Sequence, residues 1–330
     1  MHVVSRTPEE AWLPPPEIAE KMPKDVSGND VNGLGEHARR RPSPILWHHP
    51  KRIPAFAAIQ GVVNETYETH PLLGGAFNTP ERREPHEPVA PEKVDGSPEH
   101  WTEQVKAFAL ASEADQIGIT RVDPNWVFEG FEVPEPILIV LAVRMDHAEL
   151  SQAPDVPAAL EVSRQYNRGQ RAAKALANWI RRHGWNAHGH GGPGAGPLTL
   201  VPAALQAGLG ELGKHGSIIN REYGSSFRLA GVLTDLPLLT DHPEAFGADD
   251  FCLNCQVCTN ACPPDAIFRE KQEVRGTEKW YVDFDKCMPY FATTHGCGIC
   301  IAVCPWSRPG IAPRLVEKMA RRRAERQQGD

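Results

Sequence analysis

The pattern of apolar and polar positions divides the chain near residue 100. Before that point apolar residues come in short pieces, such as 53–63, separated by turn residues, and 81–95 is charged and rich in proline. Segments of this kind cannot bury a core of their own. We therefore expect residues 1–100 to form an irregular N-terminal wrap that drapes over the later domain and partly orders against a ligand.

From Trp101 onward the pattern becomes regular. Apolar residues at helical spacing predict a helix from residue 101 to about 112, and a strand follows over 116–120. The seven-residue apolar run 137–143 is typical of a fully buried central strand. A long helix is predicted over 156–183, with Asp155 as its N-cap and Gly184 at its end. A short helix from Pro202 and a second buried strand over 229–236 complete the series. This order predicts an α+β fold with helices on a mixed sheet, and a core domain over 101–240.

Composition narrows the class of protein. The chain has 330 residues, a formal net charge of -7 and 41% hydrophobic residues, which is enough for about two domains. The acidic balance argues against a nucleic-acid partner. We find no 18-residue apolar run and no apolar segment of a secretory signal near the start. Arg39–Arg41 resemble a twin-arginine signal, but prolines and histidines follow where an apolar stretch should be. We expect a cytoplasmic protein without a membrane partner.

All eight cysteines lie between residues 252 and 304, inside an expected cluster domain over 241–310 that is followed by a basic C-terminal helix over 311–330. The first run, FCLNCQVCTNACP, has the C-x2-C-x2-C-x3-C-P spacing of bacterial ferredoxins. The second run repeats it with its first cysteine displaced, as C-x9-C-x2-C-x3-C-P. This spacing predicts two [4Fe-4S] clusters.

The spacing also predicts which cysteines share a cluster. Three cysteines in one tight loop reach one cluster, and the fourth, at the start of the next helix, reaches the other. One cluster is therefore expected to have the ligands Cys252, Cys255, Cys258 and Cys304. The other is expected to have Cys262, Cys287, Cys297 and Cys300. Zinc would favour paired C-x2-C knots, and disulfides would require an oxidising compartment.

The motifs around the cysteines resemble a known family. The runs GLGELGK (208–214) and REYGSSFRLAGVLTDLPL (221–238), followed by two cluster motifs ending in CPWS, are similar to those of the corrinoid-dependent reductases. This group comprises the reductive dehalogenases and the epoxyqueuosine reductases. The upstream stretch 105–146 is closer to the cobalamin-dependent reductive dehalogenases. The resemblance covers about 101–309.

The resemblance implies a nitroreductase-like, corrinoid-binding α/β core with a C-terminal ferredoxin-like double [4Fe-4S] domain. It also implies a cobalamin held base-off, without a protein histidine on cobalt. A glycine loop is predicted over 187–197, where glycines permit close backbone approach to the polar tail of the corrinoid. An ordinary surface loop is the alternative. The candidate cofactor-binding residues are Gly189, Gly191, Gly192, Gly194, Gly196, His188 and His190.

Family dehalogenases use a tyrosine on the long helix as proton donor, assisted by a basic residue. The matching positions are Tyr166 and Arg228, with Lys214 as a further catalytic candidate. A tyrosine has a pKa near 10, so a nearby cation is needed to hold its phenolate after the proton leaves. A core aromatic and an ordinary ion-pair arginine are the structural alternatives.

The expected activity is reductive removal of halide from a small organohalide substrate. Electrons would come from a separate donor, such as a ferredoxin, a flavodoxin or a flavin reductase, and would pass through the clusters to cobalt. Two alternatives stay open. One is an epoxyqueuosine-reductase-like enzyme acting on tRNA, which the basic C-terminal helix favours, although 198–200 lacks the aspartate of that group. The other is a non-catalytic protein that transfers electrons or handles a corrinoid.

Overall fold

A four-stranded sheet forms the centre of the core in the computed structural model, which describes residues 11–48, 50–192 and 196–329. Its strands are β1 (Gln116–Arg121), β2 (Ile137–Arg144), β6 (Phe227–Thr234) and β3 (Ala187–Gly191), in the order β1-β2-β6-β3. All three hydrogen-bonded pairs are antiparallel, so the expected mixed sheet was wrong. The reason is that β6 lies between β2 and β3. These two strands run parallel but are not neighbours.

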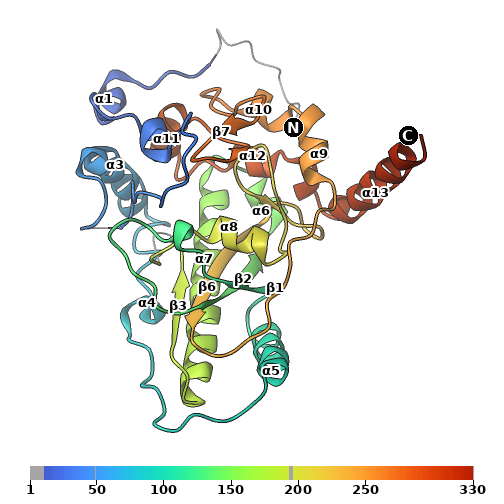
Figure 1. The fold of residues 1–330 in the computed structure, drawn as a ribbon. Helices are drawn as coiled ribbons and strands as arrows, with labels where there is room; N and C mark the ends of the chain where they lie inside the picture. The colour runs from blue at the N-terminus through green and yellow to red at the C-terminus, as the bar shows by residue number, and fades with distance from the viewer. Residues whose placement is uncertain (1–10, 49, 193–195, 330) are drawn as a thin grey trace.

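Helices cover both faces of this sheet (Figure 1). One face packs against α5 (Pro98–Ala111) and the long helix α7 (Val156–Arg182). The other face carries the short helix α8 (Leu200–Gln206). Along β2, Ile139 and Leu141 belong to the first core, whereas Leu138 and Val140 belong to the second. Burial on both faces explains why this strand is apolar from Ile137 to Val143 and polar only at its exposed last residue, Arg144.

The segment 187–197, predicted as a glycine loop, begins instead as strand β3. Its glycines allow α7 to pack directly on the strand backbone. A Cβ added at Gly189 would lie 2.5 Å from the carbonyl oxygen of Ala173, and one at Gly191 would lie 2.7 Å from the Cα of Gln170. The predicted helix over 156–183 is close to the observed α7, although the side chain of Asp155 makes no capping hydrogen bond.

The N-terminal wrap is more helical than expected. It contains α1 (Pro16–Ala19), α2 (Gly28–Asn32), the 3-10 turn Pro54–Phe56, α3 (Ala57–Glu68) and α4 (Pro80–Arg83). Helix α3, which the sequence did not predict, packs against α11 (Phe284–Thr293) of the cysteine-rich part. Phe56, Ile59 and Val63 share one buried cluster with Met288 and Ala292. The wrap is therefore anchored to the helix that carries Cys287, the first cysteine of the second run.

The cysteine-rich part consists of short elements around the thiols. They are α9 (Ala248–Asn254), α10 (Val257–Ala261), the strands β7 (Gln272–Glu273) and β8 (Glu278–Lys279), α11, and α12 (Ile299–Ala302). The predicted basic helix is α13 (Ile311–Gly329), whose C-terminal part extends away from the body (Figure 1). The smaller elements elsewhere are α6 (His147–Leu150), the 3-10 turns Pro124–Trp126 and Pro305–Ser307, and the strands β4 (Glu211–Leu212) and β5 (Ile218–Ile219). Within the described ranges, no helix combines the length and apolarity needed to cross a membrane.

Candidate active site

The eight thiols are divided between two spaces in the cysteine-rich part. The sulfur-bearing residues around the smaller, enclosed space are Cys252, Cys255, Cys258 and Cys304. Those at the wall of a much larger cavity are Cys262, Cys287, Cys297 and Cys300. This is the division into two groups of four that the spacing predicts, and the ligand roles stay a prediction. Among the described residues, no three His, Cys, Asp or Glu side chains converge on a single metal-ion position, so each group is defined by the space that it surrounds.

Burial dominates the electrostatics of these thiols. It raises the pKa of Cys252 to about 11 and that of Cys258 to about 12 in the first group. In the second group it raises the pKa of Cys287 to about 12 and that of Cys297 to about 11. A buried thiolate is costly unless a cation compensates it, and iron in a cluster supplies that compensation. The donor set therefore fits iron–sulfur clusters.

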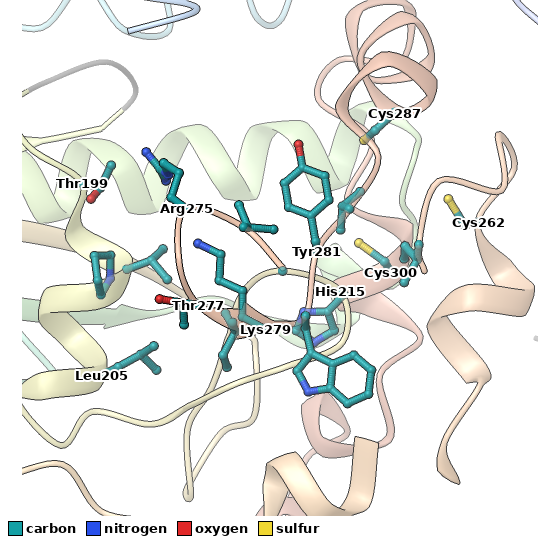
Figure 2. Close-up of a pocket in the computed structure, with 18 of the residues that line it drawn as sticks. Thr199, Leu205, His215, Cys262, Arg275, Thr277, Lys279, Tyr281, Cys287 and Cys300 are labelled. Carbon is teal, nitrogen blue, oxygen red and sulfur yellow. The ribbon is translucent and has the colours of Figure 1, made fainter. Parts of the chain in front are cut away.

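The larger cavity has a volume of about 790 Å³ and lies between the core and the cysteine-rich part. Figure 2 shows the sulfur atoms of Cys262, Cys287 and Cys300 gathered at one side of it. Residues of the core, among them Thr199 and Leu205 next to and on α8, line another side. The volume is at the upper end of the range for cofactor cavities.

Four cations of the described residues line this cavity, namely Arg39, Arg40, Arg275 and Lys279. The last two belong to the β7–β8 hairpin and lie away from the sulfur atoms (Figure 2). Burial and the neighbouring charge of Arg275 lower the pKa of Lys279 to about 8. Burial also lowers the pKa of Arg275. Since both groups are desolvated cations, they favour an anionic group in the cavity. Sequence reasoning missed these two residues, which lie in an irregular stretch between the cysteine runs.

A second, smaller pocket of about 170 Å³ contains both predicted catalytic residues, Tyr166 from α7 and Arg228 from β6. Helix α3 contributes Asn64 and Tyr67 to its wall. Cys297 lines both this pocket and the larger cavity, so the two spaces are neighbours. The pocket is small enough to hold a single compact molecule.

Tyr166 and Arg228 face each other in this pocket. The guanidinium carbon of Arg228 lies 5.2 Å from the centroid of the Tyr166 ring, within the range of a cation–π interaction. The Nε of Arg228 is buried and has no hydrogen-bond partner among the described residues. An unpaired buried donor of this kind favours an anion or a polar oxygen beside it.

Tyr67 was not predicted as a site residue. Its hydroxyl donates a hydrogen bond of 2.7 Å to the carbonyl oxygen of His295, two residues before Cys297. Burial raises the pKa of Tyr67 to about 12, so the phenol stays protonated. The signal in the sequence would have been its spacing from Asn64 and Val63 on one helix, but α3 itself was not predicted.

The candidate glycines and histidines lie elsewhere. Gly189, Gly191, His188 and His190 belong to β3, and neither they nor Gly192 and Gly196 are among the residues that line the large cavity. Gly194 lies outside the described residues. Gly192 instead lies against the ring of Tyr166, where an added Cβ would be 2.3 Å from Cε1. A role for this set in corrinoid binding stays a prediction.

Lys214 is not brought together with Tyr166 and Arg228. It lies beside the first group of thiols and lines the same small space. Burial lowers its pKa, while the thiolates of Cys258 and Cys252 would raise it. The adjacent His215 is also buried, which lowers its pKa to about 4 and keeps the ring neutral.

Comparisons with known proteins agree with this arrangement. A family model described as a 4Fe-4S dicluster domain matches residues 251–307. The chain is 34% identical over 205 residues to a tetrachloroethene reductive dehalogenase of Desulfitobacterium hafniense, which is 58% of this chain and 36% of the relative. It is 28% identical over 262 residues to the tetrachloroethene reductive dehalogenase of Sulfurospirillum multivorans, which is 65% of this chain and 52% of the relative. The chain thus spans a third to a half of these relatives.

A further relative is the epoxyqueuosine reductase of Escherichia coli K12, which is 30% identical over 178 residues, or 44% of each chain. Among solved structures, a reductive dehalogenase described in connection with B12-dependent dehalogenation matches with a TM-score of 0.72 and 26% identity, over 94% of this chain and 48% of the other. A variant of the catabolic reductive dehalogenase NpRdhA matches with a TM-score of 0.66 and 29% identity, over 79% of this chain and 38% of the other.

The predicted resemblance and fold class are therefore confirmed. The sheet and its covering helices match a reductive dehalogenase fold along almost the whole chain, and the cysteine runs match a dicluster domain. In sequence and in fold, this chain is a relative of the reductive dehalogenases and, over a shorter stretch, of the epoxyqueuosine reductases, with a 4Fe-4S dicluster domain at 251–307.

Proposed function

We propose that this chain is a cobalamin-dependent reductive dehalogenase acting on a small organohalide. The observation that carries the proposal is the adjacency of three parts. One group of four thiols borders a cavity of about 790 Å³, and the same Cys297 borders the pocket of Tyr166 and Arg228. In this proposal the thiol group relays electrons, the large cavity holds the cofactor, and Tyr166 and Arg228 act on the substrate. Electrons would pass through these adjacent parts in that order.

The large cavity fits a corrinoid in its chemistry. Arg275 and Lys279 are desolvated cations that would hold the anionic phosphate of the cofactor tail. The thiol group of Cys262, Cys287, Cys297 and Cys300 would place an iron–sulfur cluster at its wall. When bound, a corrinoid supplies a low-potential cobalt centre for reduction of the carbon–halogen bond.

The residues of the small pocket would supply the proton and stabilise the departing halide. Replacement of a carbon–halogen bond by a carbon–hydrogen bond takes two electrons and one proton and releases one halide. Tyr166 supplies the proton, and the guanidinium of Arg228 stabilises the phenolate that remains. The unpaired Nε of Arg228 offers a donor to the departing halide or to a polar oxygen of the substrate. Electrons come from a separate donor protein in the cytoplasm through both clusters.

The test combines metal content with halide release. We expect anaerobically reconstituted protein to hold about eight irons and one cobalt per chain, as two [4Fe-4S] clusters and one corrinoid require. We expect it to release bromide from bromophenols with a chemical reductant. Tyr166→Phe should lower the rate about a hundredfold or more, because the proton donor is lost.

A matched control is Tyr223→Phe. The Tyr223 hydroxyl is also buried, has no hydrogen-bond partner among the described residues, and lies outside the pocket. This variant should retain the full rate. Failure to bind cobalt, or equal rates for Tyr166→Phe and Tyr223→Phe, would contradict the proposal. Electron transfer to a partner without halide release would favour the non-catalytic alternative.

A further inference from the structure

Lys214 is a buried cation whose ammonium group has no hydrogen-bond partner among the described residues. Its residue is only 1% exposed, and its Nζ is buried and unpaired among the described residues. Lysine is almost never fully buried unless something compensates its charge. Some group beside Lys214 must therefore compensate its positive charge.

The surroundings of Lys214 indicate what compensates it. It lines the enclosed space bordered by Cys252, Cys255, Cys258 and Cys304. Its backbone N–H donates a hydrogen bond to the thiol of Cys252, and these thiols are the anionic groups whose charge acts on it. Arg269, a cation, acts in the opposite direction and lowers the pKa of Lys214.

An aromatic ring fixes the direction of the ammonium. The Nζ of Lys214 lies 4.7 Å from the centroid of the Trp280 ring. The indole N–H of Trp280 donates a 2.7 Å hydrogen bond to Asp249, which orients the ring. Trp280 is 3% exposed and also lines the large cavity. Lys214 is therefore held in place between the thiols and a rigid aromatic wall.

We infer that Lys214 tunes the iron–sulfur cluster of Cys252, Cys255, Cys258 and Cys304, raising its reduction potential by placing a buried ammonium beside it. Reduction adds one electron, so the cluster becomes one unit more negative. An adjacent positive charge stabilises the reduced form more than the oxidised form, and charge and burial are the main determinants of such potentials. The second cluster, at the large cavity, is not bordered by Lys214.

This inference rests on the cluster part of the proposed function and not on the corrinoid or the substrate. It is tested by a potentiometric titration with dithionite as reductant, followed by electron paramagnetic resonance on reconstituted full-length protein. Lys214→Met and Lys214→Gln remove the charge, and Lys214→Arg retains it. At a fixed ambient potential we expect the reduced-to-oxidised ratio of one cluster to fall about tenfold in both neutral variants, which corresponds to about 59 mV for one electron.

The Lys214→Arg variant keeps the positive charge, so the reduction potential of the first cluster should stay close to the wild-type value. The other cluster should keep its potential in all three variants. A Cys255→Ser variant identifies which resonance belongs to the first cluster, because only that signal should change. Lys271→Met is the matched control. The Nζ of Lys271 also lies near the Trp280 ring, at 5.5 Å, but it is paired with Asp249 at 2.7 Å and its side chain is 24% exposed.

Iron content separates the possible failures. If the wild-type protein binds no clusters, the proposed function itself fails. If clusters form with normal iron content and neither neutral variant shifts the first cluster, or both clusters shift equally, the role of Lys214 is overturned. A shift in Lys271→Met as large as in Lys214→Met would also overturn it, because a partly exposed, paired lysine would then act as strongly.

Discussion

At the scale of single residues, the pocket of Tyr166 and Arg228 depends on a glycine at position 192. Gly192 lies so close to Tyr166 that an added Cβ would be 2.3 Å from Cε1. Gly192→Ala must therefore displace the ring of Tyr166, the proposed proton donor. We expect a loss of about 1–3 kcal/mol in the free energy of unfolding and at least roughly a tenfold lower rate of halide release, measured by denaturant titration and by a halide assay.

Gly61→Ala is the comparison for this prediction. Gly61 lies within α3, and no atom lies within 4 Å of an added Cβ. The same substitution there should stabilise the protein by up to about 1 kcal/mol, because alanine favours the helix. Equal effects of the two substitutions would show that the contact between Gly192 and Tyr166 is unimportant.

Residue-level inference from the sequence reaches furthest where chemistry fixes the spacing. The grouping of the cysteines follows from ligand geometry alone, so it could be predicted without a fold. The pairing of Tyr166 with Arg228 came from resemblance, and the structure brings them together. Lys214 could not be placed in advance, because its neighbours Cys252 and Trp280 come from distant parts of the chain.

At the scale of elements, one carboxylate sets the start of helix α9. A single oxygen of Glu211 accepts three backbone hydrogen bonds of 2.8 Å, from Phe246, Gly247 and Ala248. This joins strand β4 to the helix that carries Cys252. Glu211→Gln should lower the free energy of unfolding by about 1.5–3 kcal/mol, the range for hydrogen bonds to a charged group.

Because Cys252 lies in α9, the same variant should also retain less iron after reconstitution. Glu317→Gln, on the exposed surface of α13, is the comparison and should change neither the iron content nor the unfolding midpoint. If the two glutamine variants behave alike, the three hydrogen bonds of Glu211 do not hold α9 in place.

The elements of the core were largely predictable and those of the wrap were not. A strand such as β2, buried on both faces, is apolar at its first seven positions, and α7 is long and periodic. Helix α3 has a narrow apolar face whose partner, α11, is more than 200 residues away in the chain. Strand β3 carries two glycines in five residues, a composition that indicates a loop until α7 is seen packed on its backbone.

At the scale of the whole molecule, each thiol group brings together separate elements of the cysteine-rich part. The first group joins α9 and α10 to Cys304, and the second joins the end of α10 to α11 and α12. Helix α3 in turn rests on α11. Loss of iron should therefore loosen both the cysteine-rich part and the wrap, since metal binding stabilises the folded state.

We expect oxidative removal of iron with ferricyanide and EDTA to lower the thermal midpoint by roughly 10 °C or more, because metal binding at such sites is itself folding free energy. Limited proteolysis should cut α3 sooner than the β2–α7 core. Unchanged protection of α3 in the iron-free protein would contradict this coupling.

The composition of the small pocket has a consequence for how such proteins diversify. Trp47, Asn64, Tyr67 and Phe77 supply one wall from the first hundred residues, whereas every cysteine lies beyond residue 251. Substitutions at Trp47, Asn64 and Phe77 can therefore reshape this wall without replacing a cysteine, whereas the Tyr67 hydroxyl is hydrogen-bonded to His295, two residues before Cys297. A library of variants at Trp47, Asn64 and Phe77 should therefore change which substrates the protein accepts, while the cluster ligands and the electron donor stay the same.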